Sequence, residues 1–578
     1  FYIEANTPVH YRRWVREGIL EWNKAFEKVG IINAIEVMQQ DAQTGMHMDK
    51  DPEDARYNFV RWTSANLGFA IGPSRVHPET GQILDADVVI DDGFVRGWFR
   101  TYNELLPQMA MTGYGAEVLS WLDRNPQWDP RVRLANPAER DLLIQQRRMQ
   151  QAAEAQEMFQ RAQAHRDAEP GREVPIMALR SGEPLMFGVT AGERRDGMIE
   201  SRSARCSAIL GKSIDVALMR TTMDAMGLLL DDEPAEGEKG DQAKGEDKKD
   251  EKKDDKKAPA KPRKKEVLLD GMPEWFVGPL LKDLVMHEVG HTLGLRHNFK
   301  ASSIYSMAQI NSEEHKGKKP ITGSVMDYNP VNINFGDGPV QGDYSMISIG
   351  TYDYWAIEYG YTSGDLKPVL ARVSEPELAY GTDEDVSGVD PRIKQFDMGS
   401  NPLDYADSTM KLVQSLRGKI LERIVKDGDS WQRARDAYLL LLSRHIGAVR
   451  IAGQHLGGAD LVRDRKGDPG NRTPITPTDV AIQRRALKFI LENAFRDEAF
   501  GLSRALLEKM TVDKWFDEGG LRTLNEDPAW PIHDRILGVQ SSALTALLNP
   551  VTLQRVFDNE VRLDPAADAL TLPELIDS

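Results

Sequence analysis

Apolar positions divide the chain into a mixed N-terminal part and a helical C-terminal part. Between residues 7 and 29 they recur at helical spacing, and Gly30 ends the pattern. Residues 57–62 and 83–90 form short apolar or alternating runs bounded by turns, which is typical of strands. Later in the chain the pattern is helical again, over residues 408–425, 430–448, 481–495 and 502–510. The pattern predicts an α+β domain followed by an α-helical domain.

Changes in residue composition predict five segments. A mostly helical insertion interrupts the α+β part. Within it, residues 138–168 are rich in good helix formers, and we expect them to form a solvent-exposed helical arm that lies near the substrate cleft of the α+β domain. A charged low-complexity run follows, and because it has almost no apolar side chains we expect a flexible loop. The segments are the first part of the α+β domain at 1–94, the insertion at 95–230, the charged loop at 231–266, the second part of the α+β domain at 267–365 and the helical domain at 366–578.

Composition narrows the possible partners. The 578 residues carry a formal net charge of -17, which argues against nucleic acid or an anionic membrane as a general partner. No apolar stretch reaches about 18 residues, so we expect no transmembrane segment.

The single cysteine, Cys206, cannot form an internal disulfide. The chain begins at Phe1 without a visible signal peptide, and we interpret it as a piece of a longer protein.

One stretch carries the chemistry of a metal site. Residues 287–297 read H-E-x-x-H-x-x-G-x-x-H. On a helix His287 and His291 share a face, so their imidazoles can point at one ion. Gly294 lets the backbone leave the helix with a positive φ, which brings His297 back towards the same point. Three neutral imidazoles suit one Zn²⁺ ion and leave a fourth position for water, as in catalytic zinc sites.

The residues around the histidines suggest further roles. Glu288 lies beside the metal position, where a carboxylate can take a proton from the water and pass it to a leaving amine. Arg296 and Asn298 flank the third histidine and are candidates for orienting it by hydrogen bonds. The apolar residues before the motif have helical spacing, and we expect them to hold the helix in a core: Trp275, Phe276, Pro279, Leu280, Leu281, Leu284 and Val285.

A second motif follows at residues 324–328, which read S-V-M-D-Y. Together with the long histidine motif it resembles the metzincin clan of zinc endopeptidases. The resemblance implies that Met326 is the Met-turn methionine, in a hydrophobic base under the metal. It also implies that Tyr328 is a retractable zinc ligand that hydrogen-bonds the oxyanion during the reaction. The implied fold is a metzincin-like catalytic domain, with a twisted sheet, a backing helix and a zinc helix.

More narrowly, the chain resembles large bacterial zinc-dependent metalloproteases that are described mainly as domains of unknown function. This resemblance covers residues 1–100 and 270–365, and it implies an exported protein that is periplasmic, at the cell surface or secreted. The segments that carry it are WNKAF at 22–26, GQILDAD at 81–87, RHNFKAS at 296–302 and YDYWAIEYGY at 352–361.

The run from Ile83 to Ile90 is, by the same resemblance, the edge strand beside the cleft. An exposed edge offers unpaired N–H and C=O groups, to which an extended polypeptide substrate can add as a further strand. An ordinary covered strand is the open alternative. Ca²⁺ is possible at the acidic side chains nearby, but their spacing matches no calcium loop and solvated acids are the simpler interpretation: Asp85, Asp87, Asp91 and Asp92.

Two functions remain open at this stage. One is a zinc-dependent endopeptidase that hydrolyses peptide bonds with a zinc-activated water and Glu288 as general base. The other is a surface or scaffold protein whose zinc site is structural or serves only self-cleavage. The intact Glu288 favours the first, because a structural site has no use for a base. Hydrolysis of an amide in a cell-wall peptide is a weaker option. The natural substrate and the oligomeric state stay open.

Overall fold

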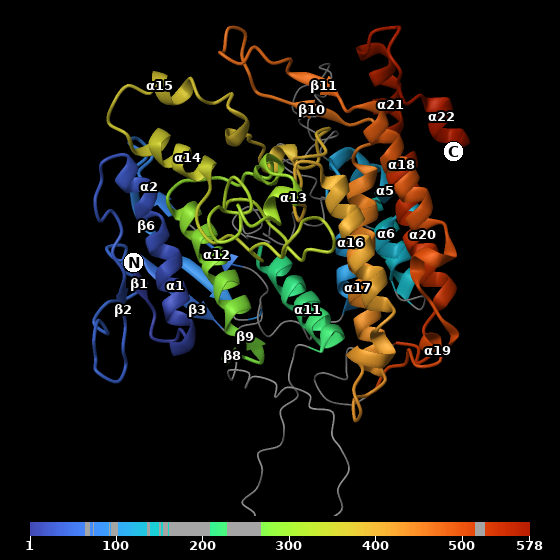
Figure 1. The fold of residues 1–578 in the computed structure, drawn as a ribbon, viewed down its shortest axis with the longest axis horizontal. Coiled ribbons are helices and arrows are strands. Elements are labelled where there is room, and N and C mark those ends of the chain that lie inside the picture. The colour runs from blue at the N-terminus through green and yellow to red at the C-terminus, as the bar shows by residue number, and fades with distance from the viewer. Residues whose placement is uncertain are drawn as a thin grey trace, which may run out of the picture.

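A computed structural model of the chain describes residues 1–63, 70–72, 74–91, 93, 102–135, 139–149, a few positions between 152 and 160, 208–227, 267–514 and 526–578. A small sheet lies at one end of the molecule, the helix with the histidine motif lies beside it, and long helices form the other end (Figure 1). The α+β fold class with added helices is therefore confirmed. The charged loop predicted at 231–266 lies outside the described residues.

The N-terminal sheet has five strands in the order β2-β1-β3-β7-β4. Strand β1 is parallel to β2 and β3, and β3 is parallel to β7, whereas β4 runs antiparallel to β7. A separate antiparallel pair, β5 and β6, precedes β7 in the sequence. The bounds are β1 Tyr2–Ile3, β2 Met38–Gln39, β3 Phe59–Thr63, β4 Ala70–Ile71, β5 Ser74–Val76, β6 Ile83–Ala86 and β7 Val88–Asp91.

The prediction that Ile83–Ile90 forms one edge strand is wrong. The run is divided at Asp87 into β6, which pairs with β5, and β7. The carboxylate of Asp87 accepts the N–H of Phe59 at 2.8 Å. Its second half, β7, lies between β3 and β4, so the edge on this side of the sheet is β4. The continuous apolar run from Val88 to Ile90 is typical of a strand with neighbours on both sides, and this signal pointed to an inner strand.

The helix predicted at residues 7–29 is confirmed as two consecutive helices that back the zinc helix. Gly18 permits their close approach, because a Cβ at this position would lie 2.8 Å from the Val285 side chain. The indole N–H of Trp22 donates to the carbonyl of Met286 at 3.0 Å. Both contacts fix the rotation of the zinc helix about its axis. The helices are α1 (Val9–Glu21), α2 (Asn23–Lys28) and the zinc helix α12 (Glu274–Thr292).

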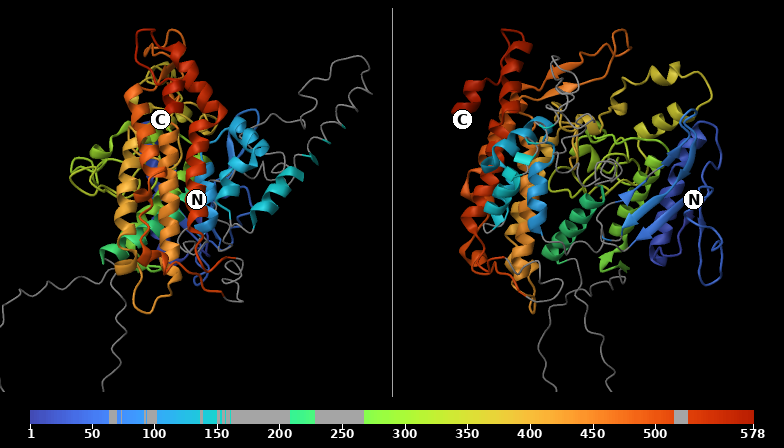
Figure 2. Two further views of the ribbon diagram at one scale, coloured as in Figure 1. Left: turned by 90° about the vertical axis from the view of Figure 1, so that its right-hand side faces the viewer. Right: turned by 180° about the vertical axis from the view of Figure 1, so that it is seen from behind.

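Helices of the insertion pack with the C-terminal helices. Helix α4 lies along α17, and α6 lies against α20 (Figure 2). Residues 139–149 are helical and largely exposed, as predicted for the arm, whose later part lies mostly outside the described residues. The helices are α4 (Tyr102–Met111), α5 (Ala116–Arg124), α6 (Pro130–Arg133), α11 (Ala208–Met226), α16 (Pro402–Arg417), α17 (Gln432–Gly453), α18 (Val480–Ala494), α19 (Arg504–Leu507), α20 (Ile532–Leu548), α21 (Pro550–Arg562) and α22 (Leu572–Asp577).

The predicted C-terminal helices are confirmed, although the run at 502–510 is helical only over α19. Two short antiparallel strands, β10 and β11, form a hairpin in this part. The remaining elements connect the sheet and the long helices: β8 (Leu268–Leu269), β9 (Met272–Pro273), α13 (Met307–Ile310), α14 (Thr351–Tyr361), α15 (Lys367–Leu370), β10 (Ala459–Leu461), β11 (Ile475–Pro477), the π-helix Ile420–Ile424 and the short 3₁₀ turns Pro126–Trp128, Ala301–Ile304, Pro376–Leu378, Asp383–Asp385 and Asp497–Phe500.

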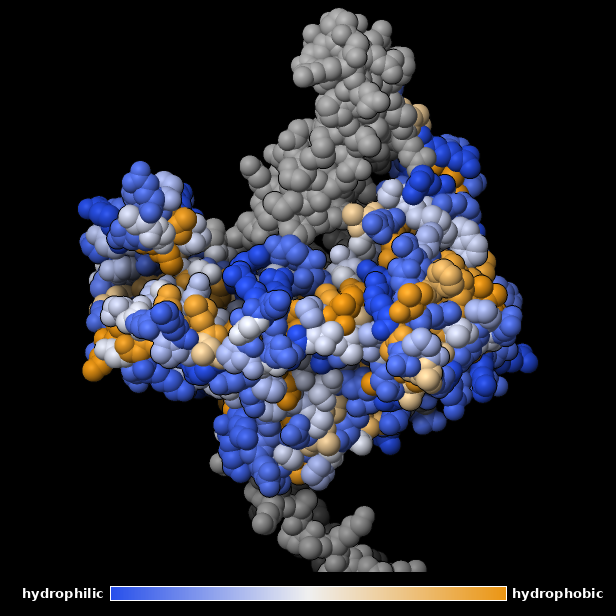
Figure 3. Space-filling view, turned by 90° about the horizontal axis from the view of Figure 1, so that it is seen from above, coloured by the Kyte–Doolittle hydropathy of each residue, from blue (hydrophilic) through white to orange (hydrophobic). Residues whose placement is uncertain are grey.

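One hydrophobic core joins these parts. A continuous cluster of buried side chains runs from Ile3 in the sheet through α12 and α11 to Val539 in α20. A buried ion pair also joins the insertion to the zinc helix, because Lys212 Nζ lies 2.6 Å from the carboxylate of Asp283. On the face seen from above, hydrophobic residues form only small groups among hydrophilic ones (Figure 3). The sheet, the zinc helix and the long helices therefore stabilise one another.

Among the described residues, the stretch Ile532–Arg562 is long and apolar enough to cross a membrane by length and composition alone. Half of its most apolar window is buried inside the protein, where α20 packs against α6 and α17. Asn549 leaves the helical conformation and Pro550 begins a new helix. These features are typical of a core helix, and the absence of a transmembrane segment stays a prediction.

Candidate metal centre

Three histidine side chains converge on one point. His287 and His291 project from one face of α12, and His297 follows the turn after it. Nε2 of His291 lies 3.1 Å from Nε2 of His287 and 3.1 Å from Nε2 of His297. Such spacing suits nitrogens arranged around one ion at about 2.0–2.1 Å. Among the described residues, no other cluster of three His, Cys, Asp or Glu side chains is close enough to share an ion.

A hydrogen bond on Nδ1 fixes the orientation and tautomer of each imidazole. Carbonyl and carboxylate oxygens only accept, so each Nδ1 carries the proton and each Nε2 directs its lone pair at the shared point. The three acceptors come from three different segments: Val325 O at 2.6 Å for His287, Leu295 O at 3.0 Å for His291 and Asp383 Oδ1 at 2.8 Å for His297.

Burial keeps two of the histidines neutral. The pKa of His287 lies well below its ordinary value, and the pKa of His291 is lowered to about 3. In both cases burial is the main cause, because it penalises the charged imidazolium, and the neighbouring imidazoles add to it. Neutral imidazole is the form that binds a metal ion.

The turn after α12 brings the third histidine back to the first two. Gly294 has a φ of +91°, a conformation that residues with a Cβ rarely adopt. The N–H of Leu295 donates to the carbonyl of Gly290, and the N–H of Gly294 donates to that of His291, both at 3.0 Å. This pair of bonds is a Schellman motif, which ends the helix and reverses the chain. His297 therefore faces the other two histidines.

The two residues of the second motif lie under and beside the histidines. Met326 is fully buried, and a Cβ at Gly290 of α12 would lie 2.4 Å from its sulfur, so the glycine makes room for it. The hydroxyl of Tyr328 lies 3.0 Å from Nε2 of His297. The structure therefore places Met326 against the zinc helix. It places the hydroxyl of Tyr328 next to Nε2 of His297, the nitrogen that points towards the other two histidines.

Glu288 is fully buried on α12, directly after the first histidine. The chain after the edge strand β4 passes close to it, because a Cβ at Gly72 would lie 2.4 Å from the carbonyl oxygen of Glu288 and 3.2 Å from the Cβ of His291. Only glycine can occupy this position without displacing the zinc helix. The edge of the sheet and the triad are therefore neighbours.

Asp353 supports the Met-turn and has no motif that would reveal it in the sequence. Its buried carboxylate accepts the N–H of Val325 at 2.9 Å and the hydroxyl of Ser324 at 2.5 Å. Burial raises its pKa to about 7. Because the carbonyl of Val325 holds His287, this carboxylate helps to orient a histidine through the backbone. The predicted helix at 352–359 is confirmed as α14, which presents Asp353 at its first turn.

Asp383 is a second residue of the site that sequence reasoning missed. It begins the 3₁₀ turn Asp383–Asp385 and holds Nδ1 of His297. Arg296 Nη2 lies 3.6 Å from Asp383 and bonds both oxygens of Glu384. The side chain of Asn298 donates to Ala379 O at 3.0 Å and accepts the N–H of Gly381 at 3.2 Å. Both residues predicted to orient the third histidine therefore contact the segment that carries Asp383.

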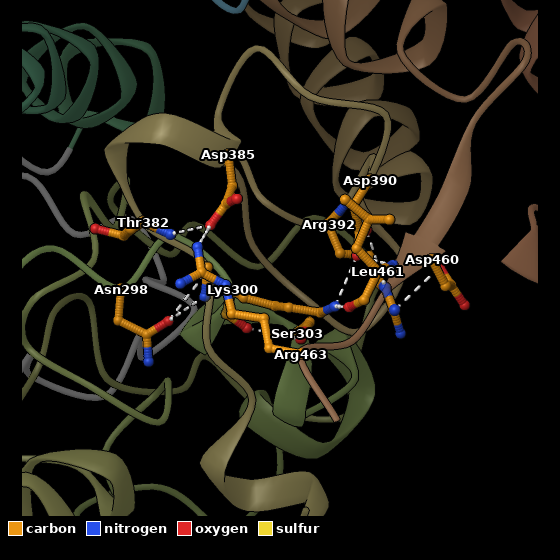
Figure 4. A network of polar contacts seen from close by, with 11 residues as sticks. Asn298, Lys300, Ser303, Thr382, Asp385, Asp390, Arg392, Asp460, Leu461 and Arg463 are labelled. Atoms are coloured by element: carbon orange, nitrogen blue, oxygen red, sulfur yellow. Dashed lines mark hydrogen bonds and ion pairs between the residues drawn. The ribbon is translucent and has the colours of Figure 1, made fainter. Parts of the chain in front are cut away.

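A network of charged groups ties this segment to the hairpin β10–β11 (Figure 4). Lys300 Nζ lies 2.6 Å from the buried carboxylate of Asp390 and donates to the carbonyl of Leu461 in β10 at 2.6 Å. Arg463, just after β10, bonds Asp385 at 2.5 Å. The C-terminal part thus positions the segment that orients a candidate metal ligand.

Two buried carboxyl groups lie behind Tyr328. The N–H of Ser302 donates to Asp327 at 2.9 Å, and its hydroxyl lies 3.2 Å from Asp397. Burial raises the pKa of both acids, that of Asp327 to about 8, and the nearby Asp327 raises that of Asp397 further. Ser302 therefore links the two buried acids through its backbone N–H and its hydroxyl.

Among the described residues, the acids considered as possible but unsupported calcium ligands belong to no group of three that could share an ion. Asp85 faces Arg75 at 3.7 Å, and Asp87 accepts the backbone N–H of Phe59. Asp92 lies outside the described residues.

Comparison with known proteins agrees with this geometry. A family model described as Met-zincin matches residues 270–578, which include the zinc helix, the Met-turn and the C-terminal helices. A zinc metalloprotease of the metzincin type is the class that this match and the histidine triad define. The chain belongs to the Met-zincin family. Neither the curated proteins nor the solved structures contain a match.

The donor set fits zinc. Three imidazoles offer nitrogen ligands, and the ring orientation is fixed by acceptors on the opposite nitrogen. No fourth His, Cys, Asp or Glu joins the cluster among the described residues. Such a set is typical of catalytic sites, whereas structural zinc sites are closed by four protein ligands.

We expect Asp383→Ala to weaken zinc binding about 10–100-fold, because the change removes the acceptor that orients His297. Competition with a chromogenic chelator measures the affinity. Glu384→Ala is the matched control, since Glu384 is an exposed neighbour that bonds Arg296 and no histidine. Equal affinities of the two variants would show that Asp383 does not orient the ligand.

Proposed function

We propose that the chain is a zinc-dependent endopeptidase that hydrolyses peptide bonds of extended polypeptides. The observation that carries the proposal is the convergence of three imidazole Nε2 atoms, with Glu288 next to the first and the Tyr328 hydroxyl 3.0 Å from the third. Zn²⁺ held by His287, His291 and His297 would supply a Lewis acid that lowers the pKa of bound water from about 15.7 towards 7.

Glu288 is the general base in this proposal. Its carboxylate takes the proton of the attacking water and delivers it to the amine that leaves. Its position directly after a zinc ligand on the helix keeps it beside the reacting water.

Tyr328 is the proposed donor to the oxyanion. Its hydroxyl contacts Nε2 of His297, and its ring packs against the rings of Phe299 and Phe396, at centroid distances of 5.0 and 5.6 Å. These contacts hold the phenol next to the position of the scissile carbonyl. A phenol that leaves His297 and donates to the oxyanion would stabilise the transition state more than the ground state.

The substrate in this proposal adds to the sheet along β4. That strand is the edge of the sheet, and it ends next to Gly72, which contacts the zinc helix at Glu288 and His291. No described strand pairs with the outer side of β4. A peptide bound there would form main-chain hydrogen bonds and pass over the histidines in an extended conformation. Export to the periplasm, the cell surface or the medium remains a proposal that rests on resemblance.

Replacement of the base tests the enzymatic role. We expect Glu288→Gln to lower kcat on casein by about 10²–10⁴-fold, because the amide cannot accept the proton, while one zinc ion per chain stays bound. Casein hydrolysis, together with zinc content by atomic absorption, measures both. Chelation should abolish the wild-type activity. Wild-type protein that binds zinc and cleaves neither casein nor its own chain would favour the scaffold function instead.

We expect Tyr328→Phe to lower kcat about 10²-fold with a small change in KM, because the lost hydroxyl acts on the oxyanion. Steady-state kinetics on a fluorogenic peptide provides the measurement. Tyr344→Phe is the control, since its ring packs against Trp275 and Phe276 in the core. An unchanged kcat would assign Tyr328 to packing alone.

The β4 hypothesis predicts a position-dependent effect of backbone methylation in the substrate. N-methylation of an amide that donates to β4 should lower kcat/KM about five- to tenfold, because one main-chain hydrogen bond of about 1 kcal/mol is lost. Alternate amides, which point away from the strand, should tolerate the change. Hydrolysis of a series of singly methylated octapeptides tests this. A uniform response along the peptide would exclude pairing with the edge strand.

A further inference from the structure

A cavity of about 260 Å³ lies between the insertion, the segment after Asp383 and the C-terminal helices. Its walls are the start of α5, the residues around Gly388, the end of α17 and the start of α21. None of the three histidines lines it, nor do Glu288 or Tyr328. Its charged and polar lining includes Glu117, Ser387, Lys394, Arg450, Gln454 and Arg555.

Three basic side chains meet in this cavity and bond only neutral groups. Arg450 is 4% exposed; its guanidinium donates to the carbonyl of Thr112 and lies 3.8 Å from the ring centre of Tyr114. Lys394 is 3% exposed, and its Nζ donates to the carbonyl of Val386 at 2.5 Å. Arg555, which is partly buried, donates to the carbonyl of Gly388 at 3.2 Å. Neutral carbonyls satisfy donors but do not balance charge.

In the part of the chain that the structure describes, no carboxylate is in close contact with these groups, although Glu117 interacts electrostatically with Arg555, and Asp390 and Asp397 with Lys394. Within the described residues, Lys394, Arg450 and Arg555 form no ion pair with a carboxylate, and the one acid in the lining is the exposed Glu117. Burial is the main cause that lowers the pKa of Lys394 to about 7; the nearby Arg555 and Arg450 also lower it, and Asp390 and Asp397 act in the opposite direction. Buried charges in proteins are normally paired, so three basic groups without a close ion pair favour binding of an added negative charge.

Two further features favour an anion in this space. The N-terminus of α5 faces the cavity, and its N-cap is Gly115, which has no side chain to bond the free N–H groups of the first turn. Buried Nε of Arg450 has no hydrogen-bond acceptor either. Unbonded donors and the positive end of a helix dipole both attract negatively charged oxygens.

We propose that this cavity binds a small oxyanion with two negative charges, of the size of a phosphate group. Phosphate oxygens would accept from the guanidinium groups of Arg450 and Arg555, from Lys394 and from the first turn of α5. The volume admits a phosphate group and a short attached chain but is smaller than typical drug-sized pockets, which begin at about 300 Å³.

The bound anion would connect parts of the chain that lie far apart in sequence. α5 belongs to the insertion, Arg450 and Arg555 belong to C-terminal helices, and Ser387 and Gly388 lie in the segment that begins at Asp383. An anion held by all three would stabilise that segment in the conformation in which Asp383 bonds His297. This makes the cavity a second, non-catalytic site that supports the metal centre.

Calorimetric titration of the zinc-loaded full chain with inorganic phosphate, sulfate and phosphoserine tests the proposal. We expect saturable binding of phosphate and sulfate and a higher Tm than in sodium chloride of equal ionic strength. Phosphoserine that binds as tightly as phosphate would identify a phosphate ester as the ligand type, and weaker binding would identify a free anion. No saturable heat with any of the three would overturn the proposal.

Variants locate the binding. Arg555→Gln should weaken phosphate binding at least about tenfold, because it removes one charged donor. Ser387→Glu adds a carboxylate at an exposed position of the lining and should weaken binding similarly without a risk to folding. Ser387→Ala and the exposed Arg504→Gln are the controls and should bind as the wild type does. Wild-type affinity in Ser387→Glu and Arg555→Gln would overturn the assignment to this cavity.

Discussion

The metal centre depends on one constraint: three neutral imidazoles must direct their Nε2 lone pairs at a single point. Each ring meets it because its Nδ1–H has a fixed acceptor, and these acceptors lie in the Met-turn, in the turn after α12 and in the segment at Asp383. A free imidazole rotates and changes tautomer, so the three hydrogen bonds select one geometry among many. The rest of the fold holds those three acceptors still.

Each acceptor has its own support. The backbone at Val325 is bonded by the buried Asp353 on α14, and the turn after α12 is closed by a Schellman motif at Gly294. The segment at Asp383 is held by Asn298, by the ion pair of Lys300 with Asp390, and by the ion pair of Arg463, which follows β10, with Asp385. Because these supports start in different parts of the chain, the site requires the whole described fold and not the zinc helix alone.

Local spacing in the sequence was enough to predict the candidate metal ligands. His287, His291, Gly294 and His297 are fixed by helix geometry, which a short motif encodes. Asp383 and Asp353 act across long sequence separations, and no local spacing assigns either carboxylate to a histidine or to the Met-turn. The edge strand was misassigned for a related reason: residues 83–90 have a strand pattern, but the neighbours of a strand are set by the tertiary fold, and β4 is too short to give a pattern of its own.

The C-terminal helices are part of the catalytic architecture in this view. The family match extends from the zinc helix to residue 578, and the contacts of β10 with Lys300 and Asp390 explain why these regions belong together. A site built from the zinc helix and the Met-turn alone would lack Asp383, the carboxylate that orients His297. The turn that carries Asp383 is itself bonded by Arg463 of the C-terminal part, through Asp385. The C-terminal part therefore supports the metal centre through the segment from Asp383 to Asp390, which β10 and the residues after it contact.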